Sequence, residues 1–271
     1  LMSAALQGHA PVMTLLLADE RVDPNLANQD GYTALIYAAE KGHDSAVKLL
    51  LADERVDPNI ASQKGSTALM FAALQGHDSA VKLLLADERV DPNIASQKGF
   101  TSLIFAAHGG HDSAVKLLLA DDRVDPNIAN QSGSTALMHA AEKGHDSVVK
   151  VLLADERVEP NIASQKGNTA LIHAADKGHD SAVKLLLADD RVDPNIANQQ
   201  RWTALIFAVN EGHDKVVTLL LTNERVDPNI ADQKGSTALI LAAYGGHDSV
   251  VTLLLADGRV DPNIVSQKGN T

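Results

Sequence analysis

The chain contains no cysteine and few aromatic residues. With Cys at 0, a disulfide framework, a thiolate zinc site and a cysteine nucleophile are all excluded. Aromatic residues make up only 3% of the 271 residues, whereas hydrophobic residues make up 45%. A compact core of this size usually contains more rings, because each ring buries roughly 150–250 Å². The apolar weight therefore lies in Ala, Leu, Ile and Val.

Basic residues and long apolar runs are also scarce. Lys and Arg number 23 against 35 Asp and Glu, which gives a net charge of −12. This excess argues against nucleic acid or an anionic membrane as the main partner. No apolar run approaches the roughly 20 residues of a membrane helix, and no signal peptide is visible. We therefore expect an intracellular, cytoplasmic location. Because a regular pattern is already under way at Leu1, we also expect a segment of a longer polypeptide.

A repeat of 34 residues runs through the whole sequence. Gly65-Ser66-Thr67-Ala68-Leu69 recurs as Gly99-Phe100-Thr101-Ser102-Leu103, and the same register continues without exception. The chain divides into a partial repeat (1–30), seven full repeats (31–64, 65–98, 99–132, 133–166, 167–200, 201–234 and 235–268) and the start of another (269–271). No linker or low-complexity segment interrupts them. The sequence thus predicts a single array over 1–271, with no domain boundary.

Each repeat reads as two short helices and a polar loop. In the repeat 31–64, Thr33 can cap a helix with apolar residues at i, i+3 and i+4, and Gly42 can end it in a left-handed conformation. Asp44 opens a second helix with the same apolar spacing. We expect Asp57-Pro58-Asn59 to stop this helix, because proline cannot donate a hydrogen bond and biases the preceding residue away from helix. Neither helix is long enough to be stable alone, so stacking on neighbouring repeats must bury both apolar faces.

The pattern Gly-x-Thr-x-Leu-x-x-Ala-Ala-x-x-Gly-His-x-x-x-Val-x-x-Leu-Leu resembles the ankyrin repeat over essentially the whole chain. It departs from the family at Thr33-Ala34-Leu35-Ile36, where ankyrin repeats usually read Thr-Pro-Leu-His, and at Arg55-Val56-Asp57-Pro58-Asn59, where they usually read Gly-Ala-Asp-x-Asn. The period is also one residue longer than the usual 33. The resemblance implies an all-α fold, an ankyrin-type α-solenoid of stacked helix–turn–helix repeats joined by hairpin-like loops. It further implies a monomeric array without cofactor or metal that binds a protein or peptide through its loop tips and concave face.

Three positions vary when the repeats are aligned with one another: the residue after the loop glycine, an outward position on the first helix, and the position just before the glycine that ends this helix. All eight aromatic residues fall at these positions. Rings often anchor protein interfaces, so we predict that these positions and their neighbours bind the partner. The predicted protein-binding residues are Tyr32, Tyr37, Glu40, Lys41, Phe71, Leu74, Phe100, Phe105, His108, His139, His173, Asp176, Trp202, Phe207, Asn210, Glu211, Leu241 and Tyr244. Two alternatives remain open: free drift of exposed positions, and rings that pack half-buried between repeats.

No pattern indicates catalysis or a metal site. Gly42-His43-Asp44 recurs from repeat to repeat, so its copies lie a full repeat apart, whereas zinc needs three or four ligands around one ion. The resemblance assigns this His to hydrogen bonding at the turn between the helices. His139 and His173 occupy one position in consecutive repeats, with His108 near. They could bind a stray transition metal, or make binding sensitive to pH.

These observations predict a non-catalytic protein–protein interaction scaffold. Three alternatives remain open: a structural spacer, a regulatory or targeting segment of a larger enzyme or channel, and an engineered consensus-like array. The variability of the predicted concave positions disfavours a spacer.

Overall fold

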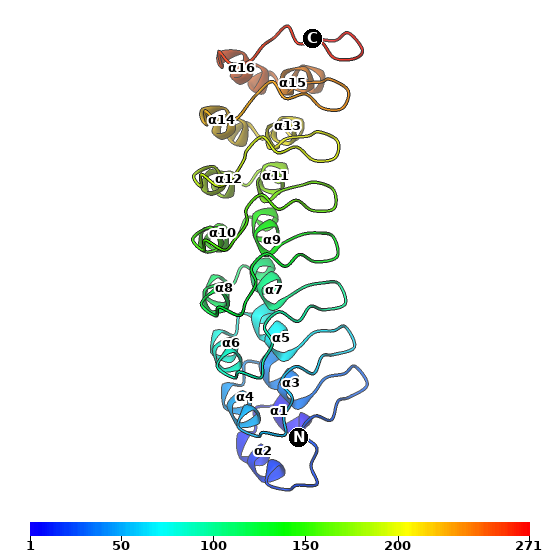
Figure 1. Cartoon of the computed structure of the whole chain (residues 1–271), viewed down its shortest axis with the longest axis vertical. Helices are drawn as coiled ribbons and strands as arrows, with labels where there is room; N and C mark the ends of the chain where they lie inside the picture. The colour runs from blue at the N-terminus through cyan, green and yellow to red at the C-terminus, as the bar shows by residue number, and fades with distance from the viewer. The chain divides into compact units, whose positions relative to one another are not determined.

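The computed structural model describes all 271 residues, as sixteen α-helices and no strand. The chain forms two compact units, Leu1–Gln131 with eight helices and Ser132–Thr271 with the other eight. The helices are α1 (Met2–Leu6), α2 (Ala10–Leu17), α3 (Ala34–Glu40), α4 (Asp44–Leu51), α5 (Ala68–Gln75), α6 (Asp78–Leu85), α7 (Ser102–Gly109), α8 (Asp112–Leu119), α9 (Ala136–Lys143), α10 (Asp146–Leu153), α11 (Ala170–Asp176), α12 (Asp180–Leu187), α13 (Ala204–Asn210), α14 (Asp214–Thr222), α15 (Ala238–Gly245) and α16 (Asp248–Ala256). Within each unit the odd-numbered helices form one row and the even-numbered helices another, and the loops extend beyond the odd-numbered row (Figure 1). The predicted helix pairs are confirmed, while the single uninterrupted array stays a prediction.

The first helix of each repeat begins and ends where the sequence predicted. In α7 the Thr101 side chain accepts a hydrogen bond from the Ile104 N–H at 3.3 Å, and Gly110 follows the helix with φ of 77°. The equivalent threonine caps every odd-numbered helix from α3 onward. Ala106 and Ala107 are fully buried. Side chains this small let neighbouring helices approach closely, which explains why the core contains few rings.

The second helices end earlier than the sequence predicted. α4 stops at Leu51, well before Pro58. The carbonyls at its end are satisfied from the next repeat, because the Arg89 guanidinium donates to Leu51 O at 2.8 Å and to Val56 O at 2.9 Å. Asp87 in turn binds this guanidinium at 2.6 Å. The turn after the helix is closed within its own repeat, where Arg55 N donates to Asp53 Oδ1 at 3.0 Å, and the proline lies beyond that turn.

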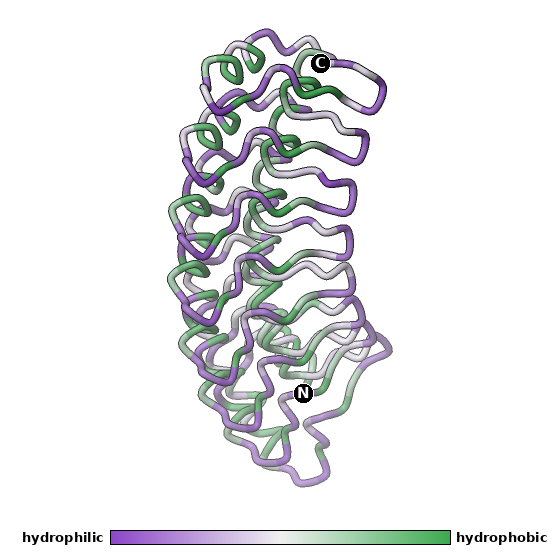
Figure 2. The backbone as a smooth tube through the Cα atoms, turned by 45° about the horizontal axis from the view of Figure 1, so that its top comes forward, coloured by the Kyte–Doolittle hydropathy of each residue, from purple (hydrophilic) through white to green (hydrophobic).

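The loops are narrow hairpin-like turns that hydrogen-bond to one another within each unit. In one of them Ser62 N donates to Ser66 O at 2.9 Å, closing the turn. The next loop attaches to it through two bonds, from Gln97 N to Lys64 O at 3.0 Å and from Gln97 Nε2 to Gln63 O at 2.7 Å. The tips themselves are hydrophilic (Figure 2). Because each loop is bonded to its neighbour, the tip positions are held in register.

The largest fully buried side chains are aliphatic or methionine, and none is aromatic. None of the sixteen helices combines the length and the apolar character needed to cross a membrane.

Candidate protein-interaction face

The predicted binding residues lie at three positions that repeat along each unit, and we call the surface that they form the loop face. In the repeat 31–64 these positions are Tyr32, Tyr37 and Glu40, with Lys41 beside the last. The first is the tip position, directly after the loop turn. The second is the helix position, outward on the odd-numbered helix, and the third is the end position, near the end of that helix. Most tip and helix residues are half-buried, whereas Tyr244, at an end position, is 90% exposed.

Aromatic side chains of the first unit pack against one another across consecutive repeats. The Tyr32 ring at a tip lies 5.2 Å from the ring of Tyr37 on α3 and 5.1 Å from that of Phe71 on α5. The Tyr37 hydroxyl accepts a hydrogen bond from Asn28 Nδ2 at 2.9 Å. One tip ring therefore bridges the first helices of two repeats. In the repeat 99–132, the centres of the Phe100 and Phe105 rings lie 5.2 Å apart.

The second unit has one ring pair of this kind. Trp202 at a tip and Phe207 on α13 lie 5.1 Å apart in an edge-to-face arrangement. Trp202 is also fixed through its backbone N–H, which donates to Asn198 Oδ1 at 2.9 Å. These geometries show that the rings pack half-buried, the alternative that the sequence left open for the helix position. Half-burial leaves part of each ring accessible.

The charged candidates pair with their sequence neighbours. Ion pairs join Glu40 to Lys41 at 3.4 Å and Asp176 to Lys177 at 3.0 Å, and a hydrogen bond joins Asn210 Nδ2 to Glu211 Oε1 at 2.9 Å. Leu74 and Leu241 are half-buried on their helices. Such neighbouring charges form a polar border along the loop face, where exposed ion pairs add little stability.

A polar pocket of about 380 Å³ opens in the second unit beside His139 and His173. Its lining residues are Ser132, Ser134, His139, Glu142, Ser164, Gln165, Lys166, Asn168, His173, Asp176 and Lys177. The structure thus brings these two predicted histidines to one pocket, while His108 belongs to the first unit. His173 Nε2 is buried without a hydrogen-bond partner, and burial lowers the pKa of His173. Burial therefore favours the neutral form of this imidazole.

A second pocket, of about 400 Å³, opens in the first unit beside the tip residue Ser66. It is lined by Lys64, Ser66, Ser96, Gln97, Lys98, Phe100 and Phe105. Of these, only the two phenylalanines were predicted as binding residues. The missed lysines precede the loop glycine, at a position that is Lys in five of eight copies and otherwise varies, as the series Asp30, Lys64, Lys98, Ser132, Lys166, Gln200, Lys234, Lys268 shows. That variation was the signal that could have identified them.

The recurring histidines before the second helices are structural. His77 Nε2 lies 3.0 Å from Glu40 O, and the equivalent histidines contact the carbonyl 37 residues earlier in the same way. A carbonyl oxygen can only accept, so Nε2 carries the proton. The predicted role in hydrogen bonding at the turn is confirmed. Nowhere does the structure bring together three His, Cys, Asp or Glu side chains that could hold a metal ion.

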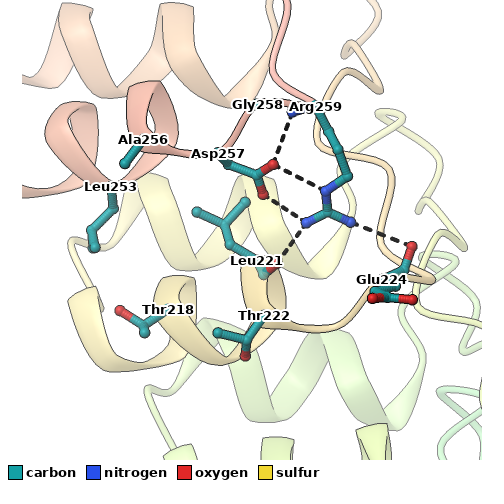
Figure 3. Close-up of a pocket in the computed structure, with 9 residues that line it drawn as sticks. All are labelled: Thr218, Leu221, Thr222, Glu224, Leu253, Ala256, Asp257, Gly258 and Arg259. Carbon is teal, nitrogen blue, oxygen red and sulfur yellow. Dashed lines mark hydrogen bonds and ion pairs between the residues drawn. The ribbon is translucent and has the colours of Figure 1, made fainter.

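The arginine that follows a second helix contacts the preceding repeat. Figure 3 shows Arg259 bound to Asp257 and reaching back to the carbonyls of Leu221 and Glu224. This arginine donates to a carbonyl at the end of α14, so its role is structural. The shallow groove around it therefore gives no indication of a binding site. Side chains of the loop face vary between repeats, and contacts such as the bond from Asn198 Nδ2 to Asn168 Oδ1, at 3.0 Å, are particular to one repeat.

The family model for ankyrin repeats matches residues 1–96, 79–165, 103–198, 152–232 and 181–266. The chain belongs to the ankyrin repeat family. Among solved structures it is similar to the ankyrin repeat protein EF0377, with 32% sequence identity and a TM-score of 0.65, over 69% of this chain and 96% of that one. No curated protein shows significant similarity to the chain. Ankyrin repeats are in general protein–protein interaction modules and typically non-enzymatic, which makes the loop face the first place to look for a binding site.

Proposed function

We propose that the chain is a non-catalytic scaffold that binds a protein partner through the loop face, which is the family's loop tips and concave face. The supporting observation is the placement of the rings. All eight aromatic residues lie at loop-face positions, seven of them half-buried and so partly accessible. Rings of this kind contribute a disproportionate share of binding energy at protein interfaces.

The alternative of free drift explains this placement less well. The second helices are exposed at the position of Lys48, Lys82 and Lys116, yet this position carries only Lys or Thr in all eight repeats. Positions that vary and carry partly accessible rings are therefore better explained by partner binding than by absence of constraint. We further propose a monomeric array in the cytoplasm, with neither nucleic acid nor membrane as partner, in keeping with the net charge of −12.

The test compares the two faces. The partner is first identified by capture on the immobilised chain, and its affinity is then titrated against Trp202→Ala, Phe207→Ala, Lys48→Ala and Lys82→Ala. The two loop-face variants should each lose at least about 1–2 kcal/mol of binding free energy, the scale of hot-spot rings. The two lysine variants should change little, because exposed charges far from an interface contribute little.

Thermal unfolding of each variant separates lost binding from lost folding, which matters because the rings of Trp202 and Phe207 pack together. If the lysine variants weaken binding and the ring variants do not, the partner occupies the second-helix face and the proposal is wrong.

A further inference from the structure

The tip position has a defined place for a ring. In the first repeats of the first unit, Tyr32 fills the space between the first helices of its own and the next repeat, 5.1 Å from the Phe71 ring. One repeat later, Ser66 is the counterpart of Tyr32 and Phe105 is the counterpart of Phe71. Ser66 has no ring to contribute, and a pocket of about 400 Å³ lies between Ser66 and Phe105.

This pocket has an apolar floor and a basic rim. Phe100 and Phe105, paired at 5.2 Å, supply the aromatic surface. Lys64 and Lys98 line the pocket from two adjacent loops, are exposed, and take part in no ion pair. The end positions of these two repeats carry no carboxylate either, since they read Leu74-Gln75 and His108-Gly109. In a chain of net charge −12, this is a local site for negative charge.

The pocket is also rigid. Its two loops are joined by the bonds from Gln97 to Lys64 O at 3.0 Å and to Gln63 O at 2.7 Å. A ligand therefore meets an ordered rim, and the entropy lost on binding is reduced. The volume exceeds what one ring fills and lies within the range of sites that hold a ligand with several groups.

We propose that this pocket binds an aromatic side chain of an acidic peptide segment in the partner protein. The ring occupies the place that Tyr32 fills in the preceding repeat, and carboxylates beside it in the peptide pair with Lys64 and Lys98. The proposal rests on the proposed function, because it specifies the partner chemistry at one part of the loop face.

The probe is the pentapeptide Ac-Glu-Glu-Phe-Glu-Glu-NH2, titrated into the full chain and followed by backbone amide shifts in NMR spectra. Ser66→Tyr fills the pocket from within, as Tyr32 does, and should weaken peptide binding at least tenfold. Ser236→Tyr places the same side chain at a tip position in the other unit and should leave the affinity within twofold. Amide spectra of both variants report whether they are folded.

Charge is tested with a matched pair of double variants. Lys64→Glu with Lys98→Glu should weaken binding at least tenfold, whereas Lys48→Glu with Lys82→Glu, the same change of net charge on the second-helix face, should change it less than twofold. Replacing Phe by Ala in the peptide should also cost at least tenfold. The proposal is overturned if the wild-type chain does not bind the peptide, if the two double variants behave alike, or if Ser66→Tyr leaves binding unchanged.

The experiments distinguish a failure of this proposal from a failure of the proposed function. If the peptide fails to bind while Trp202→Ala and Phe207→Ala weaken an identified partner, the loop face is the binding face and only the pocket's assignment is wrong. If the peptide binds as described but those two variants leave the partner unaffected, the pocket stands and the wider assignment of the loop face fails.

Discussion

Arg201 occupies a backbone position that elsewhere belongs to glycine. It has φ of 60° and is the only non-glycine residue with positive φ, whereas the equivalent Gly65 has φ of 76°. The loop follows the same path despite the substitution, because Arg201 N donates to Asn198 O at 2.8 Å as Gly65 N does to Ser62 O. The conformation is therefore retained with strain, and Arg201→Gly should stabilise the protein.

The size of the gain follows from two opposing effects. A residue with a Cβ atom in the left-handed region costs roughly 1–2 kcal/mol relative to glycine. A Cβ atom at Gly65 would lie 2.8 Å from Gln97 N. The residue that corresponds to Gln97 beside Arg201 is Gln233. Its N–H donates to Gln200 O at 3.2 Å, the longest of the seven hydrogen bonds in which a glutamine N–H joins one loop to the preceding loop. Glycine also gains freedom in the unfolded chain, which offsets about 0.4–1 kcal/mol. The net stabilisation should be about 0.5–1 kcal/mol.

Urea unfolding monitored by circular dichroism measures the change as a shift in midpoint at constant slope. Gly167→Ala is the control of opposite sign in the same unit, since its Cβ atom would lie 2.9 Å from Asn198 Cα and should cost at least about 1 kcal/mol. Hydrogen exchange at the Gln233 amide should slow in Arg201→Gly. An Arg201→Gly protein no more stable than the parent, next to a destabilised Gly167→Ala, would refute the assignment of strain to this loop.

Two further predictions concern ionisable groups. Asn223 stands where other repeats have an aspartate that binds the arginine two residues later in the sequence. Asn223→Asp should therefore pair with Arg225. The expected gain in the free energy of unfolding is about 0.5–1 kcal/mol, the scale of a partly exposed charge pair. Such a pair lowers the carboxyl pKa, as Arg191 does for Asp189, so urea unfolding should show the gain at pH 7 and its loss as the pH falls through that lowered pKa. Burial lowers the pKa of His173 below 6.5, so the unfolded chain binds more protons and stability should fall as pH drops below about 6.5, by at most about 1.4 kcal/mol per pH unit. His173→Phe should flatten that dependence, and an unchanged slope from pH 7 to 5 would contradict the assignment.

Local rules predicted most of the fold. The threonine cap and the glycine that ends the first helix act within a few residues, and both recur in register, so Thr101 and Gly110 could be assigned from the sequence. The end of the second helix could not. The sequence placed it at Asp57-Pro58-Asn59, whereas Leu51 is the last helical residue of α4 and Asp53 Oδ1 accepts from Arg55 N just beyond it, at 3.0 Å. That turn depends on the conformation of the Asp53 side chain, which the spacing of residues does not reveal.

The sequence selected the candidate positions, whose role in binding stays a prediction, but it could not show the shape of the surface that they form. Variation between repeats located the tip and helix positions, yet it could not show that Tyr32 packs against Phe71 or that Ser66 leaves a pocket beside Phe105. The pocket forms where a small tip residue stands opposite a ring at the helix position of the next repeat. That arrangement becomes visible only once the stacking of repeats within the unit is known.

The separation between constant and variable positions has a physical origin. Asn59 shows what a constant position does, since its amide donates to Arg89 O at 2.7 Å and accepts from Asp91 N at 2.9 Å. Replacing it leaves two groups of the next repeat without partners, and each unsatisfied group costs roughly 1–3 kcal/mol where it is shielded from water. The tip side chains share no such constant role, since Asn168 Oδ1 accepts from Asn198 Nδ2 at 3.0 Å, whereas the rings of Tyr32 and Trp202 pack against other rings. The constant positions therefore hold neighbouring repeats in one register, and the tip positions can carry different side chains on the same scaffold.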